Sequence, residues 1–281
     1  MKKIAIIIVL FHPSDDDIKH LKHLSMVYWG AVVDNSPTKL FENDKIGKML
    51  YVHNGANLGI ASAQNKGVAA CLDKHSDITH FVFLDQDTRV DIDYPEHIAL
   101  EMDKAQEQIG NVGIIGPSVI NSTTEKPYES HIHKDKSLTK TFYEKLFVIS
   151  SGCCITHHVW NRVGSFEDNM FIDFVDSEWC WRAKREGFHC ISSNNVTISH
   201  KVGQHLFKIG PYQDIISKSF RYFYQYRNYI WLCKRDYVPL KWKVTTGIKY
   251  LLRFMYVPFT SDNGNLAIRN MVKGIIEGLR Q

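Results

Sequence analysis

Apolar and polar residues alternate along the first 120 residues in blocks that predict strands and helices in turn. Short runs rich in Ile, Val and Phe are typical of strands, and apolar residues at helical spacing indicate helices between them. The expected strands cover residues 3–11, 31–33, 48–53, 81–84 and 112–116, and the expected helices cover residues 15–29, 60–74 and 95–108. This rhythm predicts an α/β fold, with a mostly parallel sheet and helices on both faces.

The pattern changes along the second half of the chain. Residues 121–140 are polar and irregular, and we expect them to form a mobile loop that closes over a bound ligand. Short strands and helices are expected after Ile149, and the chain from Tyr212 onward is expected to be helical. We therefore expect a main domain over residues 1–205 and a basic, aromatic-rich helical region over residues 206–281.

Two carboxylates follow the most apolar of these strands. Residues 81–84 run directly into Asp85, Gln86 and Asp87. The acids then lie at the carboxyl end of the strand, where open α/β sheets bind their ligands. Residues i and i+2 of an extended chain point the same way, so both acids can face one hard cation on a phosphate-bearing ligand. The alternative is a solvated acidic turn.

A second candidate site lies on the same sheet edge. Asp34 ends another expected strand, where an acid commonly accepts hydrogen bonds from a base edge or from ribose hydroxyls, although a turn or capping role is the alternative. Gly59 precedes a helix whose first turn carries small residues, which leaves room for an anionic ligand. Asn65 can hydrogen-bond either to a ligand or to the backbone.

Acidic residues gather again near position 175. Asp173, Asp176 and Glu178 lie between large apolar residues, so partial desolvation should raise their proton affinity and suit one of them to act as a general base. The alternative for Asp176 is a helix-capping role. His200 follows a short expected strand, where a neutral imidazole can complete a metal shell or serve a structural role.

Several other classes of protein are excluded by what the sequence lacks. The first strand is not followed by the Gly-x-Gly-x-x-Gly of a dinucleotide-binding fold, and no P-loop sequence is present. The 6 cysteines include no Cys-x-x-Cys pair, so we expect reduced thiols in a cytosolic protein. No run of apolar residues is long enough to predict a membrane span.

Charge is distributed unevenly along the 281 residues. Residues 201–281 hold 14 Lys and Arg against 4 Asp and Glu, a net charge of +10, whereas residues 1–200 hold 20 against 26, a net charge of −6. A basic tail favours an anionic partner surface, for which lipid is the expected choice rather than nucleic acid. The residues expected at that surface are Arg221, Arg227, Lys234, Arg235, Lys241 and Lys243, with Tyr222, Phe223, Tyr226, Tyr229 and Trp231. The alternative is that the aromatic residues form a helical core or a dimer interface.

The order of these motifs over residues 3–205 resembles that of the family 2, A-type nucleotide-sugar glycosyltransferases. The matching stretches are residues 33–36, 57–67, 84–87, 151–152, 163–167, 171–182 and 200–203. The amino-acid sequences of residues 84–87 and 171–179 are similar to those of the bacterial rhamnosyltransferases that build O-antigens and capsules.

The resemblance implies an A-type glycosyltransferase fold and a role for each motif. Asp34 would contact the base, Asp85 would lie near the ribose, and Asn57, Gly59 and Asn65 would form the nucleotide loop. Asp87 would hold Mg²⁺ or Mn²⁺, with His200 as a further metal or diphosphate contact. Asp176 would be the catalytic base. Many relatives have Glu before that Asp, whereas here Val175 precedes it and Asp173 lies nearby, so both acids remain candidates.

The resemblance also implies an activity. We expect an inverting enzyme that moves a sugar, rhamnose from dTDP-rhamnose, onto a saccharide or lipid-diphosphate-linked acceptor in surface polysaccharide synthesis. It would work in the cytoplasm or peripherally on the cytoplasmic face of the inner membrane, and a homo-oligomer stays open. The alternatives are a transferase that uses a UDP-hexose, a metal-dependent phosphohydrolase, and an inactive nucleotide-sugar-binding subunit.

Overall fold

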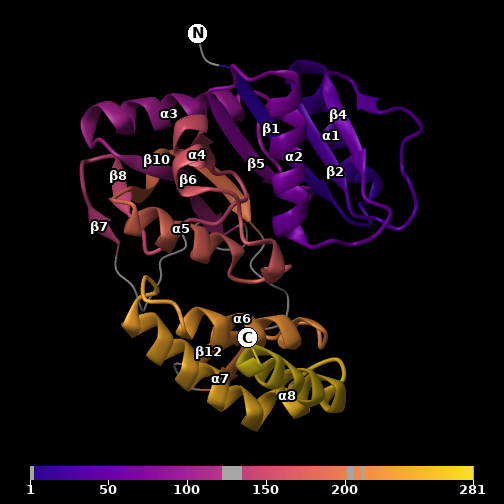
Figure 1. Ribbon diagram of the computed structural model, residues 1–281, viewed down its shortest axis with the longest axis vertical. Helices are drawn as coiled ribbons and strands as arrows, with labels where there is room; N and C mark the ends of the chain where they lie inside the picture. The colour runs from indigo at the N-terminus through magenta and orange to yellow at the C-terminus, as the bar shows by residue number, and fades with distance from the viewer. Residues whose placement is uncertain (1–2, 122–134, 201–205, 210–211, 281) are drawn as a thin grey trace.

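The computed structural model describes residues 3–121, 135–200, 206–209 and 212–280. Figure 1 shows a sheet with helices on both faces and a group of helices beyond it. The strands are β1 Ile4–Leu10, β2 Gly30–Asp34, β3 Lys45–Ile46, β4 Met49–His53, β5 His80–Asp85, β6 Val112–Asn121, β7 Lys136–Ser137, β8 Phe142–Glu144, β9 Cys154–Thr156, β10 His189–His200, β11 Leu206–Ile209 and β12 Tyr212–Ile215. The helices are α1 Asp15–Val27, α2 Ile60–Lys74, α3 Tyr94–Gln108, α4 His157–Val163, the 3₁₀ turn η1 Asp168–Met170, α5 Val175–Arg185, α6 Arg221–Cys233, α7 Leu240–Thr260 and α8 Gly264–Arg280.

The main sheet has ten strands in the order β3-β4-β2-β1-β5-β9-β6-β10-β8-β7. Strands β4, β2, β1 and β5 are parallel neighbours, and β6 and β10 form a second parallel pair. Strand β9 lies antiparallel between β5 and β6 and joins the two parallel parts. The mostly parallel sheet confirms the predicted α/β class.

Two helical layers cover the sheet, and side chains alternate between them along each strand. Leu21 of α1 and Ile98 of α3 pack on one face, where they share a core with Val82 of β5. Helices α2, α4 and α5 pack on the other face, against Phe81 and Phe83 of the same strand. Because the period of a strand is two residues, Asp85 continues the Phe81–Phe83 side and faces the layer that contains α5.

Local sequence explains where the first helices begin. Ser14 accepts a hydrogen bond from the Asp17 backbone N–H at 3.2 Å, and the Asp17 carboxylate accepts one from the Ser14 N–H at 2.8 Å, which forms a capping box at the start of α1. Helix α2 begins after Gly59, whose φ of 84° is one that L side chains rarely adopt. The predicted strands and helices of residues 3–116 are thus confirmed to within a few residues.

The second half departs from the sequence-based prediction in three places. Strand β7 occupies part of the stretch 121–140 that was expected to be a loop, and residues 122–134 of that stretch lie outside the described residues. The strand that ends at His200 is not short but twelve residues long. Strands β11 and β12 pair as an antiparallel hairpin in a stretch expected to become helical from Tyr212, so helix α6 begins only at Arg221.

Helices α6, α7 and α8 pack around their own core on the α5 side of the sheet (Figure 1). Tyr222, Tyr226 and Trp231 were predicted to meet a membrane, but they are buried at 0%, 3% and 8% exposure. The membrane role is therefore wrong for these three side chains, and the alternative of a helical core is correct for them. Packing among the neighbouring helices is favoured over contact with a membrane, because it removes large aromatic surfaces from water.

Candidate active site

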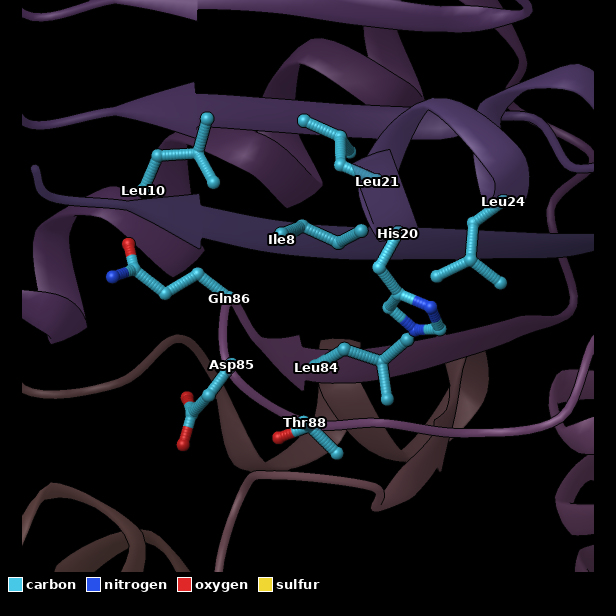
Figure 2. Close-up of a pocket in the computed structure, with 9 residues that line it drawn as sticks. All are labelled: Ile8, Leu10, His20, Leu21, Leu24, Leu84, Asp85, Gln86 and Thr88. Carbon is cyan, nitrogen blue, oxygen red and sulfur yellow. The ribbon is translucent and has the colours of Figure 1, made fainter. Parts of the chain in front are cut away.

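Asp85 ends β5 at the carboxyl edge of the sheet, and Asp34 ends β2 at the same edge. Strand β1 lies between them, with Leu10 paired to Asp34 and Val9 paired to Asp85, so the shared edge expected from the sequence is confirmed. Figure 2 shows the Asp85 carboxylate directed away from His20, Leu21 and Leu24. The small cavity lined by those three residues has a volume of about 10 Å³, which is room for one water and not for a sugar nucleotide.

The residues after Asp85 form a turn that is fixed to the neighbouring strand end. The Gln86 side chain accepts a hydrogen bond from the Phe11 N–H at 2.7 Å and donates one to the Phe11 carbonyl at 3.3 Å. The Arg89 guanidinium donates to the Gln86 carbonyl at 3.1 Å and pairs with Asp17 of α1 at 2.6 Å. The chain is therefore not extended through Asp87, contrary to the prediction, because the strand ends at Asp85. Asp87 itself is exposed.

A third carboxylate approaches from α5. Burial is the largest influence on Asp176 and raises its pKa to about 6, although hydrogen bonds from the Ser150 N–H and hydroxyl lower the pKa in part. Burial also raises the pKa of Asp85 to about 7, and the negative charges of Asp176 and Asp87 raise it further. Asp85 thus lies close enough to Asp176 and Asp87 to be repelled by both, with no Lys or Arg that neutralises Asp85 or Asp176 among the described residues.

Asp85 and Asp176 line one cleft of about 490 Å³, a size within the range of small-molecule sites. Its other walls come from α2, from residues before α5, and from the C-terminal helices. These residues are Ile60, Phe147, Ser150, Ile172, Asp173, Phe174, Val175, Ser177, Arg221 and Trp242. The C-terminal helices therefore complete the cleft, and they do so on the side of Asp176.

Asp173 also lines the cleft, but it is neutralised. Arg221 of α6 donates to its two carboxylate oxygens at 3.1 and 2.6 Å, a bidentate ion pair. Gln225 contacts one of these oxygens at 3.5 Å. Arg221, predicted for a membrane surface, thus serves the cleft. Within the described part of the chain, the two candidate bases differ in their surroundings, because Asp173 has a cationic partner and Asp176 has hydrogen-bond donors from Ser150 alone.

The backbone that leads to Asp176 is strained. Phe171, Asp173 and Phe174 have φ values of 62°, 67° and 67°. Non-glycine residues in such conformations cost on the order of 1–3 kcal/mol each and cluster at functional sites. Phe174 is the residue immediately before α5, so the strained segment sets where that helix, and with it Asp176, begins.

Asn228 of α6 holds this strained segment, a role that was not predicted from the sequence. Its side-chain nitrogen lies 2.9, 2.9 and 3.0 Å from the carbonyl oxygens of Met170, Ile172 and Asp173. Arg227 donates to the Asn228 side-chain oxygen at 2.9 Å, which fixes the orientation of the amide, and to the Asn169 carbonyl at 2.6 Å. The two N–H groups of the amide are thereby shared among three carbonyls, of which that of Met170 also accepts from the Ile172 N–H at 2.7 Å. A polar Asn within an aromatic helix could be noticed in the sequence. The carbonyl groups that it binds could not be predicted.

The predicted nucleotide loop is held by its own side chains. The Asn57 side-chain oxygen accepts from the Gly59 N–H at 3.0 Å, and the Gly59 carbonyl accepts from the Asn35 amide at 3.0 Å. A Cβ on Gly59 would lie 2.4 Å from the Phe171 carbonyl oxygen, so the close approach that requires glycine is to the strained segment. Asn65 uses both ends of its amide on Phe166, at 2.9 and 3.0 Å, which is the backbone role that the sequence left open.

Asp34 is completely buried. Its two carboxylate oxygens accept hydrogen bonds from the Ser36 N–H at 2.8 Å and from the Tyr51 hydroxyl at 2.6 Å. Burial, with the hydrogen bond to Asp34, raises the pKa of Tyr51 to about 12. Asp34 therefore fixes the turn that follows β2.

The residues predicted to bind metal are only partly described. Within residues 3–121, 135–200, 206–209 and 212–280, no three His, Cys, Asp or Glu residues gather into a metal cluster. His200 ends β10, but its side chain lies outside what the structure describes. Asp85 and Asp87 nevertheless suit a hard cation, because Mg²⁺ is commonly held by one or two carboxylates together with substrate phosphates. Their mutual repulsion is what a cation would relieve.

Comparison with known proteins agrees with this architecture. Residues 32–164 match the model of glycosyl transferase family 2. Residues 32–164 therefore have the sequence features of a family 2 glycosyltransferase domain. It is also 27% identical over 261 residues to the dTDP-rhamnosyl transferase RfbF of Shigella flexneri, a match that covers 89% of this chain and 86% of that protein. The transferase is therefore rhamnosyltransferase-like.

Two further proteins are similar to this transferase. A hexosyltransferase of low-salt glycan biosynthesis from Haloferax volcanii is 26% identical over 197 residues, which are 65% of this chain and 62% of that one. The crystal structure of GalNAc-T7 with UDP, GalNAc and Mn²⁺ matches with a TM-score of 0.51 at 13% identity, over 71% of this chain and 43% of that one. The structural likeness confirms the A-type glycosyltransferase fold.

Because the acids lie close together, we expect the free energy of unfolding to depend on pH. The folded pKa of Asp85, about 7, exceeds the value of about 3.9 for a solvated Asp, so the folded protein binds more protons between those two pH values and its stability should fall as pH rises. Asp85→Asn should therefore raise the free energy of unfolding of the metal-free transferase by about 1–3 kcal/mol at pH 8, with the gain vanishing near pH 4.

Urea unfolding curves at a series of pH values, in the presence of a chelator, measure this difference. The exposed Asp91 provides the matched control, since Asp91→Asn should show no such pH-dependent gain. Equal pH slopes for the wild type and Asp85→Asn would show that Asp85 is not destabilised by its neighbours.

From the contacts of Asn228 we predict the effect of replacing it. Asn228→Leu should lower the free energy of unfolding by about 2–4 kcal/mol, because it leaves buried carbonyls without donors. It should also reduce the transfer rate per folded molecule, because the segment that sets the start of α5 loosens. Asn270→Leu is the matched control, since the Asn270 amide also donates to one carbonyl, that of Ser219, at 3.0 Å but away from the cleft. A folded Asn228→Leu protein with wild-type transfer would contradict the positioning role.

Proposed function

We propose that this transferase moves a sugar from a nucleotide-diphosphate donor to an acceptor hydroxyl with inversion, in bacterial surface polysaccharide synthesis. The observation that carries the proposal is that Asp85, at the end of β5, shares one cleft with Asp176, which no cation among the described residues neutralises. The proposed donor is dTDP-rhamnose, and the support for it is the similarity to a dTDP-rhamnosyl transferase. The proposed acceptor is a saccharide or a lipid-diphosphate-linked saccharide.

The donor is proposed to lie along the carboxyl edge of the sheet. Asp34, Asn57, Gly59 and Asn65 would build the nucleotide side, and Asp85 would lie near the ribose. Asp34 and Asn57 would act through the backbone turns that they hold, because their side chains already bond to those turns. Asp87, with His200, would hold Mg²⁺ or Mn²⁺ on the diphosphate. When bound, the cation would neutralise charge on the departing diphosphate.

Asp176 is proposed as the base. Its pKa is raised towards the pH at which a base works best, whereas the Asp173 carboxylate is already engaged in an ion pair with Arg221. Asp176 would take the proton of the acceptor hydroxyl while the oxygen bonds to the anomeric carbon. The bond from that carbon to the diphosphate oxygen would break on the opposite face, which inverts the configuration. A positioned base typically contributes about 10²–10⁴-fold to the rate.

A UDP-hexose is the second candidate donor, because a hexosyltransferase is among the similar proteins. The fold and the acids serve both donors equally well. The choice depends on how the cleft contacts the sugar and on how the Asp34 edge contacts the base.

Melting temperatures measured with a panel of nucleotide sugars, with and without Mn²⁺, test the proposal. We expect dTDP-rhamnose with Mn²⁺ to stabilise most, by about 2.7 kcal/mol at 100 times its dissociation constant. Asp87→Ala should remove the Mn²⁺-dependent part of that gain, while Asp91→Ala, at an exposed acid after the turn, should keep it.

The melting temperatures, together with assays of sugar transfer and phosphate release, also distinguish the alternatives. Stabilisation by UDP-hexoses alone would identify the second donor. Release of phosphate from the donor at the same rate with and without acceptor saccharides would indicate a phosphohydrolase. Binding of a donor by a protein that transfers nothing to any saccharide or lipid-linked acceptor would indicate an inactive binding subunit.

A further inference from the structure

Helix α7 presents a continuous apolar face to solvent. Six apolar side chains follow one another at spacings of three or four residues, and they are between 52% and 87% exposed. We call them the α7 ridge: Leu240, Val244, Ile248, Leu251, Met255 and Phe259. Such spacing places all six on one side of the helix. Scattered exposed apolar residues are ordinary, but an unbroken row along a whole helix indicates an interaction surface.

The ridge is not the face on which α7 folds against the protein. Trp242, Tyr250 and Val257 are buried at 6%, 5% and 0% exposure, and they occupy the opposite side of the helix. Tyr250 stacks on Tyr226 with ring centroids 4.6 Å apart, so the inner face already has its partners in α6. Helix α7 is thus apolar on two sides, and only one of them is used by the fold.

Helix α8 continues the exposed apolar surface. Val272, Ile276 and Leu279 follow the same three-to-four-residue spacing and are exposed, while Met271 on another side of α8 is fully buried. Helices α7 and α8 pack together, and α8 lies on the far side of α6 from the sheet in Figure 1. The start of α7 lies against α5, where Trp242 contacts Trp181 with ring centroids 4.7 Å apart. The ridge and the exposed side of α8 point outward from these packed faces.

The charges around this surface select its partner. Helices α7 and α8 contain seven Lys and Arg residues and a single acid, Glu277, and two of the seven, Lys249 and Arg253, pair with the buried Asp214. Lys241, Arg269, Lys273 and Arg280 are exposed. A second copy of the chain would bring two such basic surfaces together, which is unfavourable. An anionic lipid surface offers headgroups to the cations and an apolar interior to the ridge, the combination typical of interfacial helices.

We infer that the α7 ridge, with the exposed side of α8, docks the protein on an anionic membrane surface. None of the helices in the described ranges is long and apolar enough to cross a membrane, so the helices lie along it. Trp242 lines the cleft beside Asp176 from the inner face of α7, whose outer face carries the ridge. The inference rests on the proposed function for its purpose, because docking would hold the enzyme at the membrane that carries a lipid-linked acceptor.

Co-sedimentation with vesicles tests the inference without any need for activity. We expect the protein to pellet with vesicles of phosphatidylcholine and phosphatidylglycerol, and to remain in the supernatant with phosphatidylcholine alone. Binding should weaken in 1 M salt, where the screening length falls to about 3 Å. Recovery in the supernatant with both kinds of vesicle at low salt would overturn the inference.

Substitutions on the ridge identify the surface. The triple variant Leu251→Ser, Met255→Ser and Phe259→Ser should weaken vesicle binding more than tenfold and leave the melting temperature unchanged, since these side chains are exposed. Met26→Ser, at an exposed apolar residue of α1, is the control and should bind as the wild type does. Equal binding by the triple variant and the wild type would overturn the assignment to α7.

Two further measurements separate this inference from its rivals. Sedimentation velocity without lipid should show the same monomer for the wild type and the triple variant. A dimer that the variant dissociates, with no binding to anionic vesicles, would assign the ridge to a second copy instead. Melting shifts with nucleotide sugars should be unaffected by the triple variant, so a failure of the donor proposal and a failure of the docking proposal give different results.

Discussion

Segment 171–174 is the constraint on which the candidate active site depends. Its left-handed residues are held from two sides, because the Ile60 N–H at the start of α2 donates to the Phe171 carbonyl at 2.7 Å and Asn228 of α6 donates to three carbonyls. The segment thereby ties the proposed nucleotide loop, the start of α5 and the C-terminal helices into one unit. Gly59 belongs to the same arrangement, since any side chain there would meet Phe171. Loosening the segment would move the base relative to the donor edge.

The acids around the cleft differ in whether they have a cationic partner. Arg221 neutralises Asp173, and Arg182 and Arg235 pair with the buried Glu178 on the same helix as Asp176. Among the described residues, Asp85 and Asp176 have no cationic partner, so burial raises the pKa values of both. The arrangement costs stability in the metal-free protein, because two desolvated carboxylates repel each other. The same arrangement places a proton acceptor and a site that attracts a cation in one cleft.

Much of this could be predicted from the sequence, because it depends on local pattern. The apolar run 81–84 before Asp85 and the capped helix after Ser14 gave the strands, the helices and the shared edge of Asp34 and Asp85. The relation between Asp173 and Asp176 could not be predicted, because it depends on Arg221, which is 48 residues distant from Asp173 in the chain. Tyr222 and Tyr226 were misplaced for a related reason, since composition alone cannot tell which aromatic face of a helix is covered. The α7 ridge became visible only once the buried side of the helix was known.

The central claim is that Asp176 is held desolvated and without a cationic partner, ready to accept a proton. Carbon-13 NMR of the side-chain carboxyl groups, titrated in metal-free buffer and assigned with Asp176→Asn, measures this directly. The account predicts that the Asp176 carboxyl titrates with a pKa of about 6. Titration near the value of about 3.9 that is typical of a solvated Asp would contradict it.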